Sequence, residues 1–311
     1  MQSSPLHGFA ANWVAIALAL LFTPCAVAQT WTTGFFNTNQ GWVPGGVVTG
    51  QNTNDVASAQ WQGNDPEDEI SPGVFVGGTD IVAFANGYTP FGSGSGNNSL
   101  VQGGAYLTEG YFPGTNSVIL SRQFSPVPVG PGGTVSFYAE WSLIGSLNVT
   151  YPNLDTFSFD LRNAANTESL LTLQLAPGIN IQPNSYTLQA LAGGSPTQTL
   201  VDLAYQSLFQ IQVDLSGSTY DVTLNQINSI DRTNIATFIL ATGESLAAGT
   251  TAEDFGTVAI NWDLTSGDPA QPGSNYIVVN EITVVPEPRT YALLSVAAIA
   301  LALVATRRRR A

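Results

Sequence analysis

Carboxylates are the side chains of this sequence that could carry out acid–base chemistry. Four of them alternate with apolar neighbours along stretches of period two: Glu140, Asp160, Asp214 and Asp221. A glycosidase needs two carboxylates roughly 5–10 Å apart across a cleft, so a carbohydrate-active hydrolase is one hypothesis for the chain. Acidic side chains on the solvent face of strands are also the ordinary outcome in a chain this acidic. We therefore expect that the protein is not an enzyme, and the glycoside hydrolase is the alternative.

A second group of carboxylates forms a dense acidic run, Asn-Asp-Pro-Glu-Asp-Glu, that begins at Asn64. The four acids of the run are Asp65, Glu67, Asp68 and Glu69. Carboxylates this close repel one another unless solvent or a cation lies between them, and calcium takes six to eight oxygen ligands. The spacing fits no EF-hand pattern, so a solvated acidic loop is the simpler interpretation and a calcium site is the alternative. We expect no other cofactor.

The residue types that are missing exclude several reaction classes for the region 29–285. This region contains no cysteine, histidine or lysine. The Ser-His-Asp triad, thiolate nucleophiles, lysine Schiff bases and zinc sites built from cysteine or histidine are therefore excluded. The region has 21 acidic residues against the three arginines Arg122, Arg162 and Arg232, a net charge of −18. Such a charge repels nucleic acid, and we expect no nucleic-acid partner.

Aromatic side chains could also bind a ligand, because an exposed ring can stack on the face of a sugar. The candidates lie in glycine-rich sequence of weak periodicity and are Trp42, Trp61, Tyr88 and Tyr111. Burial under loops is the commoner outcome for such residues, so both interpretations stay open. Trp141 and Trp262 differ, because they are in phase with apolar neighbours and are expected in the core.

The elements that must position these residues are β-strands, because apolar residues recur with a period of two along most of the region. The predicted strands are Asp80–Ala85, Ser117–Phe124, Thr134–Leu143, Thr156–Arg162, Leu170–Leu175, Thr187–Ala190, Leu208–Leu215, Tyr220–Leu224, Val258–Trp262 and Tyr276–Val285. The turn Ser216-Gly217-Ser218 predicts a hairpin, and the glycine-rich run Gly92–Ser99 predicts a flexible loop. Between residues 29 and 285 no segment keeps a helical period.

Ten or more strands in about 257 residues favour a single all-β domain, an antiparallel two-sheet sandwich of the jelly-roll or lectin-like kind, over residues 29–285. Strands with the sequences Phe-Ser-Phe-Asp, Ile-Gln-Val-Asp-Leu and Tyr-Asp-Val-Thr-Leu follow one another from Asp155. This series resembles the concanavalin-type jelly roll. The Glu-x-Asp-x-x-Glu strand of laminarinase-like jelly rolls is absent, which agrees with the expectation of a non-enzymatic protein. Such a domain would bind exopolysaccharide or would be a structural matrix component without a defined ligand.

The two ends of the chain carry apolar segments with different flanking residues. Trp13–Phe22 is followed by Ala26-Val27-Ala28, which predicts a signal peptide over residues 1–28 with Ala26 and Ala28 at its cleavage site. At the other end, Pro286-Glu287-Pro288 precedes the uncharged run Tyr291–Ala305, which as a helix would span roughly 22 Å of a ~30 Å hydrocarbon core. Four arginines precede the last residue, Ala311, and would stay cytoplasmic: Arg307, Arg308, Arg309 and Arg310.

The C-terminal arrangement over residues 286–311 resembles the PEP-CTERM sorting signal of bacterial surface proteins. The resemblance rests on the Pro-Glu-Pro tripeptide, the short apolar helix and the terminal arginines, in that order. It implies secretion through the translocon, transient anchoring in the inner membrane through 291–305 and cleavage by an exosortase. The expected destination is the cell surface or extracellular matrix, with exopolysaccharide as the partner there. An ordinary C-terminal membrane anchor is the alternative.

Overall fold

The described part of the chain is almost entirely β-strand and belongs to one compact unit, Thr30–Glu287. The computed structural model describes residues 30–34, 61–63, 68–71, 74–76, 79–84, 97–103, 117–124, 133–145, 154–177, 185–193, 195–204, 208–228, 231–264 and 275–287. Helical structure within these ranges is a single 3-10 turn, η3 (Ala252–Asp254), and they contain no helix long and apolar enough to cross a membrane. The predicted signal peptide and the apolar run 291–305 lie outside the described residues.

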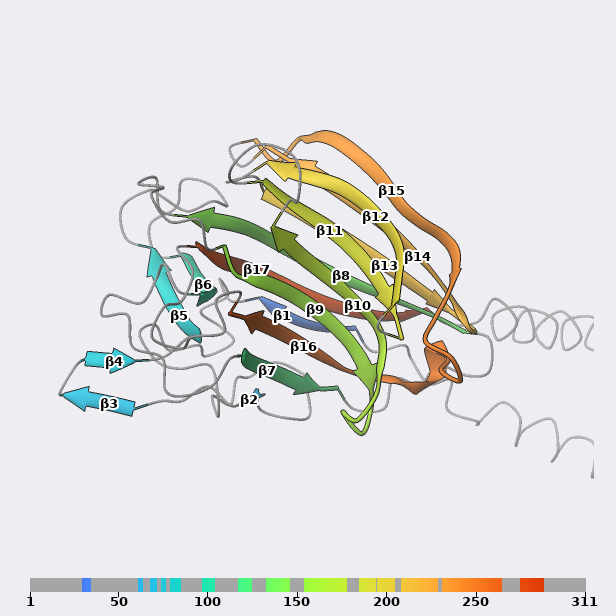
Figure 1. The fold of residues 1–311 in the computed structure, drawn as a ribbon, viewed down its shortest axis with the longest axis horizontal. Coiled ribbons are helices and arrows are strands. Elements are labelled where there is room, and N and C mark those ends of the chain that lie inside the picture. Colours follow the sequence, from blue (N-terminus) through green and yellow to red (C-terminus); the bar gives the residue numbers. More distant parts are fainter. Residues whose placement is uncertain are drawn as a thin grey trace, which may run out of the picture. The chain divides into compact units, whose positions relative to one another are not determined.

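Two antiparallel sheets contain nearly all of the described strands (Figure 1). Sheet A has the order β15-β14-β13-β8-β17-β6-β5, with β1 also paired to β17. Its strands are β1 (Trp31–Gly34), β5 (Thr79–Phe84), β6 (Asn97–Gly103), β8 (Thr134–Gly145), β13 (Leu208–Ser216), β14 (Thr219–Ile227), β15 (Asn234–Ser245) and β17 (Asn275–Glu287). This sheet supplies the site described below.

Sheet B has the order β12-β11-β10-β9-β16-β7-β2. Its strands are β2 (Gln62–Gly63), β7 (Ser117–Gln123), β9 (Thr156–Asn163), β10 (Ser169–Pro177), β11 (Ser185–Ala192), β12 (Ser195–Ala204) and β16 (Phe255–Asp263). A separate hairpin pairs β3 (Asp68–Ser71) with β4 (Val74–Val76). The arrangement confirms the predicted all-β fold with two antiparallel sheets.

The core lies between the sheets and is built from the side chains that alternate inward along each strand. Phe137 and Trp141 of β8 lie 6.2 and 6.3 Å from the ring of Phe159 on β9, so rings of sheet A pack against a ring of sheet B. Trp141 also stacks on Phe209 of the neighbouring strand β13 at 4.9 Å. Aromatic pairs at such distances contribute about 0.5–1.5 kcal/mol beyond the burial of their area. Trp141 and Trp262 are fully buried, as predicted.

The hairpin predicted around Gly217 joins β13 to β14. Ser216 and Thr219 are direct partners, which leaves a two-residue loop. Gly217 has φ of 56°, and a positive φ at the first loop position is what type II′ hairpins require of glycine. The Thr219 hydroxyl donates to the Ser216 carbonyl at 3.0 Å and closes the turn. This turn fixes the register of β14, which carries part of the outward face of sheet A.

A buried polar network joins the two sheets at the start of β9. Asp155 has no exposed surface, and its Oδ2 accepts a hydrogen bond from Trp262 Nε1 at 2.9 Å. Its backbone N–H donates to Asn275 Oδ1 at 2.9 Å, and its carbonyl accepts from the Tyr186 hydroxyl at 2.8 Å. Burial, and secondarily the charge of Asp155, raises the pKa of the Asp263 carboxyl above its ordinary value of 3.8. The network ties β11 and β16 of sheet B to β17 of sheet A.

Seven strands in the described part of the chain have no counterpart among the predicted ones: the short strands β1, β2, β3 and β4, and the longer strands β6, β12 and β15. Strand β6 begins at Asn97, inside the segment Gly92–Ser99 that the sequence predicts as a flexible loop. It pairs with β5 on one side and β17 on the other, so its place in the sheet overrides a polar local sequence. Strands β12 and β15 are the longest of the unpredicted strands. Both have register shifts against their partners, and such irregularities break the alternation by which strands are recognised.

Strand β17 extends beyond the predicted end of the domain at residue 285. Pro286 pairs with Val135, and Glu287 pairs with Thr134, both on β8. Pro286 is buried. The first two residues of the Pro-Glu-Pro motif therefore belong to the sheet, while Pro288 and the four terminal arginines lie outside the described residues.

Candidate functional site

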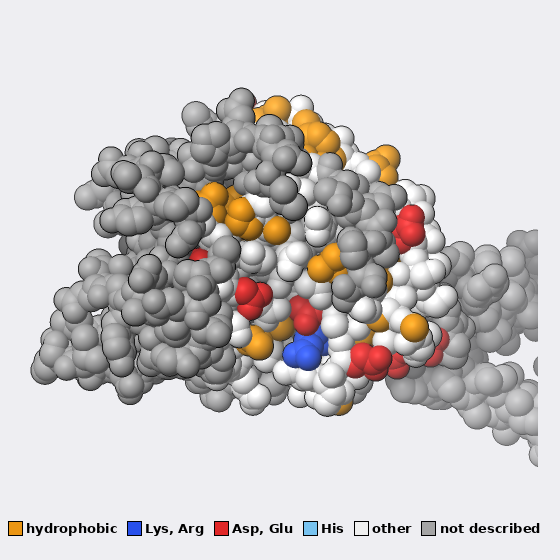
Figure 2. All heavy atoms as spheres, in the orientation of Figure 1, with side chains coloured by type: hydrophobic (Ala, Val, Ile, Leu, Met, Phe, Trp, Pro, Cys, Tyr) orange, Lys and Arg blue, Asp and Glu red, His pale blue; other side chains and the backbone are white. Residues whose placement is uncertain are grey.

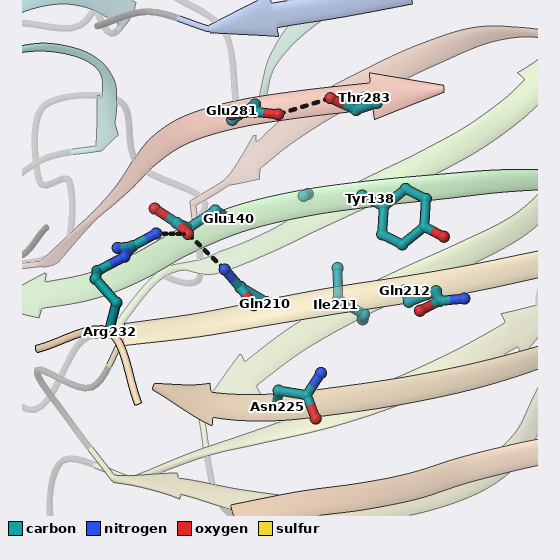
Figure 3. A pocket seen from close by; sticks show the side chains of 10 residues that line it. Tyr138, Glu140, Gln210, Ile211, Gln212, Asn225, Arg232, Glu281 and Thr283 are labelled. Atoms are coloured by element: carbon teal, nitrogen blue, oxygen red, sulfur yellow. Dashed lines mark hydrogen bonds and ion pairs between the residues drawn. The ribbon is translucent and has the colours of Figure 1, made fainter. Parts of the chain in front are cut away.

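A pocket of about 370 Å³ lies on the outward face of sheet A, on the side away from the core (Figure 3). Strand alternation places polar side chains there, because their neighbours along each strand point into the core. The polar lining includes Tyr138 and Glu140 from β8, Gln210 and Gln212 from β13, and Glu281 and Thr283 from β17. The pocket therefore offers carboxylate, amide and hydroxyl groups side by side.

Glu140 is the centre of this pocket and is held in place by three donors. Its side chain is buried although it points away from the core, with 7% of the residue exposed. Gln210 Nε2 donates to Glu140 Oε2 at 2.8 Å, and the guanidinium of Arg232 forms an ion pair with the same oxygen. Asn280 Nδ2 donates to the other oxygen, Oε1. Hydrogen bonds to a charged group are stronger than those between neutral groups, so Glu140 has a fixed orientation.

A β-bulge in β17 brings two polar side chains beside Glu140. The register between β17 and β8 shifts between Val279 and Glu281, and Asn280 is the extra residue. Glu281 is the direct partner of Glu140, and bulges are common next to functional sites because they re-aim side chains. The sequence contains a signal for this bulge, because the apolar residues of β17 that belong to the core cluster change from odd to even numbers: Ile277 and Val279, then Ile282 and Val284.

Arg232 reaches Glu140 from the turn that joins β14 to β15. Its backbone has φ of 63°, a left-handed conformation that costs a non-glycine residue roughly 1–2 kcal/mol. The turn is held by Arg232 N–H donating to the Asn228 carbonyl at 3.0 Å and by Asn228 N–H donating to the Thr233 carbonyl at 2.9 Å. Asp231 caps it, and hydrogen bonds from Thr233 lower the pKa of the Asp231 carboxyl below 3.8. Strained residues of this kind cluster at functional sites.

The predicted carboxylates Asp214 and Asp221 also lie on sheet A, as direct partners across β13 and β14. Asp214 Oδ1 accepts hydrogen bonds from Ser136 Oγ at 2.5 Å and Gln212 Nε2 at 3.1 Å. Asp221 Oδ1 accepts from the Gly243 N–H at 2.5 Å. Neither carboxylate lines the pocket around Glu140. Their hydrogen bonds indicate structural roles in strand pairing.

Asp160 is separated from the other three predicted carboxylates because it belongs to sheet B. It lies on β9, where Thr172 Oγ1 and Ser169 Oγ donate to its Oδ1. Arg162 Nε lies 3.4 Å from its other oxygen. The carboxylate that does lie beside Glu140 is Glu281, which the sequence analysis did not select because a residue after a bulge is out of phase with the strand.

The predicted calcium ligands are only partly within the described residues. Asp65 and Glu67 lie outside them, whereas Asp68 and Glu69 begin strand β3 rather than continuing a loop. Among the described residues no cluster of three or more acidic, histidine or cysteine side chains is placed to hold a metal ion. Calcium binding by the acidic run stays a prediction.

Of the four candidate sugar-stacking aromatics, the structure describes one. Trp61 is 1% exposed, and the guanidinium of Arg122 lies 5.8 Å from its ring centroid. Of the two interpretations of Trp61, burial is therefore the correct one, and its ring, inside the core, is not available to stack on a sugar. Trp42, Tyr88 and Tyr111 lie outside the described residues, as do the proposed cleavage residues Ala26 and Ala28. The half-buried Tyr138 is the ring that lines the pocket.

Comparisons with known proteins give structural likenesses at low identity. No protein-family model matches the chain, and no curated protein matches it. A protein of unknown function from Shewanella oneidensis MR-1 is 12% identical with a TM-score of 0.43, over 92% of this chain and 95% of that one. An endo-1,3-beta-glucanase from Streptomyces sioyaensis is 17% identical with a TM-score of 0.42, over 83% and 97%.

Lectin II from Ulex europaeus is 10% identical with a TM-score of 0.40, over 74% of this chain and 99% of that one. The architecture of this protein rests on the strand pairing described above, and its function is argued from the side chains of its own pocket.

Proposed function

We propose that this protein is a carbohydrate-binding β-sandwich whose ligand lies over Glu140 on the outward face of sheet A. Sugar hydroxyls both donate and accept hydrogen bonds, and the pocket presents both kinds of partner. Glu140 and Glu281 are acceptors, Arg232 is a donor, and the amides of Gln212 and Asn225 are both. A volume of about 370 Å³ falls at the small end of the range for ligand pockets, roughly 300–1,000 Å³.

The observation that carries the proposal is the fixed orientation of Glu140. A carboxylate that points away from the core could lie free in solvent, yet this one is held by a guanidinium and two amides. Preorganised polar groups bind a ligand with less loss of side-chain entropy. Tyr138, two residues along the same strand, adds a half-buried ring that can pack against a sugar face.

The proposal is tested by screening the full chain on a glycan array beside the Gln212→Ala and Tyr138→Ala variants. Both side chains line the pocket without contributing to the core, so each variant should fold. We expect a carbohydrate ligand for the wild type and weaker binding for each variant. A wild-type chain that binds no glycan would favour a purely structural matrix protein. Unchanged binding by both variants would place the ligand elsewhere.

A glycoside hydrolase that uses Glu140 and Glu281 is the second candidate. Direct cross-strand partners have Cβ atoms roughly 5 Å apart, and retaining glycosidases hold their carboxyl groups roughly 5–5.5 Å apart. The three donors on Glu140 occupy three of the roughly four acceptor sites of a carboxylate. The remaining site can accept one sugar hydroxyl, which favours binding over attack by this carboxylate as a nucleophile. The Glu281→Gln variant separates the candidates: it should abolish hydrolysis by an enzyme, whereas a binding protein releases no reducing sugar before or after the substitution.

We also propose that the chain is exported and sorted to the cell surface, where exopolysaccharide would be its ligand. The support is the order of Pro286-Glu287-Pro288, the apolar run 291–305 and the terminal arginines. Strand β17 ends at Glu287, so the segment from residue 288 onward is the part that a processing enzyme could remove without breaking the sheet. Expression in bacteria with and without an exosortase tests this proposal. A mature chain of the same mass in both strains would contradict it.

A further inference from the structure

A second pocket, of about 290 Å³, lies on sheet B at the edge formed by β7 and β2. It is bounded by β2, β7, β16 and the turn between β9 and β10. Its polar lining is Gln62, Ser121, Gln123, Asn166 and Thr257. Every one of these side chains is an uncharged amide or hydroxyl. Figure 2 shows acidic and apolar side chains scattered over the described part of one face, with a basic side chain beside an acidic one.

Hydrogen bonds hold the wall of this pocket in place. Gln123 Nε2 donates to the Ala164 carbonyl at 2.6 Å, which fixes the turn against β7. Asn166, a left-handed residue with φ of 58°, donates from Nδ2 to Ser121 Oγ at 3.3 Å and accepts from Arg162 Nη1 at 2.9 Å. These bonds hold the turn against β7, and they fix the orientation of the amide side chains of Gln123 and Asn166.

Thr257 contributes to this pocket a buried hydroxyl that a ligand could pair with. The residue is 1% exposed, and its Oγ1 is buried without a hydrogen-bond partner among the described residues. Thr257 lies on β16 between Gln123 on one side and Arg162 on the other. A buried hydroxyl without a partner is unfavourable, and this one lies at the pocket, where a ligand hydroxyl could pair with it.

We propose that this pocket is a second carbohydrate subsite, for one uncharged sugar unit, separate from the site around Glu140. The ligand class follows from the lining, because amides and hydroxyls without a charged group match neutral sugar hydroxyls rather than an ion. The choice of a carbohydrate as the ligand rests on the proposed function. The two sites lie on the outward sides of different sheets, so one chain would bind two glycan strands and link them.

The test uses the full chain, with glucose, galactose and mannose as probes observed by saturation-transfer NMR and titration. In the Glu140→Gln background, at least one of these sugars should still bind. Adding Thr257→Val should then weaken that binding about tenfold, the effect expected for one lost hydrogen bond. The valine keeps the branched shape and removes only the unpartnered hydroxyl, so the melting temperature should not fall. Ala165→Trp, at the exposed turn, should block the pocket sterically.

Thr172→Val is the matched control on the same sheet. Its hydroxyl donates to Asp160 Oδ1 at 3.0 Å outside the pocket, so this variant should lose stability and keep sugar binding. Loss of all binding in Glu140→Gln alone would overturn the second subsite and leave the proposed function intact. Loss of all binding in Thr257→Val alone would overturn the proposed site around Glu140 and leave the second subsite intact. Absence of binding by the wild type, or residual binding unchanged by both Thr257→Val and Ala165→Trp, would also overturn the second subsite.

Discussion

Replacing Glu140 by glutamine should destabilise the protein while keeping the shape of the side chain. Glutamine has one acceptor oxygen where the carboxylate has two, so at least one of the three donors from Gln210, Asn280 and Arg232 loses its acceptor. The guanidinium also loses its counter-charge. Hydrogen bonds to charged groups contribute about 1.5–3 kcal/mol, and the 42% exposure of the Arg232 side chain screens its share. We expect a loss of about 2 kcal/mol, since one charged hydrogen bond is removed.

Thermal and urea unfolding of the full chain measure this loss. For a domain of this size each kcal/mol lowers the melting temperature by about 2–4 °C, so the expected shift is about 4–8 °C. A double-mutant cycle with Arg232→Ala should give a coupling energy within about 0.5–3 kcal/mol, the range for residues in direct contact. Glu281→Gln is the matched control, because Glu281 is exposed and, within the described ranges, accepts only a local bond from Thr283 at 2.8 Å. Its effect should stay within about 0.5 kcal/mol.

An unchanged melting temperature for Glu140→Gln would refute this reasoning. So would additive effects of the Glu140 and Arg232 substitutions, because independent residues show no coupling. Either result would mean that Glu140 is solvated and mobile, and it would no longer support a preorganised binding site.

Three further predictions concern stability. Burial and the nearby Asp155 raise the pKa of Asp263. The ionised form is thus disfavoured in the folded state, and stability falls as the pH rises through the folded pKa. Asp263→Asn should therefore raise stability at pH 7 and lose this advantage below pH 4, as measured by urea unfolding at both values. A chain ending at Glu287 should unfold like the full chain, whereas one ending at Val285 should lose about 1 kcal/mol from two missing strand pairings; equal stability would show that the end of β17 contributes nothing. The net charge of −18 over residues 29–285 should make the melting temperature higher in about 0.15 M salt than in low salt.

The strands of the core could be predicted from the sequence because their residues carry the information locally. In Thr134–Leu143 the apolar residues occupy every second position, and the structure buries all five of them. Trp141 and Trp262 lie in phase with such neighbours and are buried as expected. Gly217 marks its hairpin because the turn needs a positive φ. Each of these features depends on residues within a few positions of one another.

The site around Glu140 could not be assembled in this way because its members are distant in sequence. Arg232 lies 92 positions from Glu140, and Asn280 lies 140 positions from it. Their meeting depends on the order of β8, β13 and β17 in sheet A and on the bulge at Asn280. The sequence left two interpretations of Trp61 open for a related reason, since its burial comes from long-range packing and its own sequence has no period.

The central claim is that a carbohydrate binds over Glu140, and a crystal structure of the chain with a glycan selected on the array tests it most directly. We expect a sugar ring on the outward face of sheet A, with hydroxyls hydrogen-bonded to Glu140 and Gln212 and a face packed on Tyr138. A glycan bound away from sheet A, with the pocket around Glu140 left to solvent, would contradict the claim.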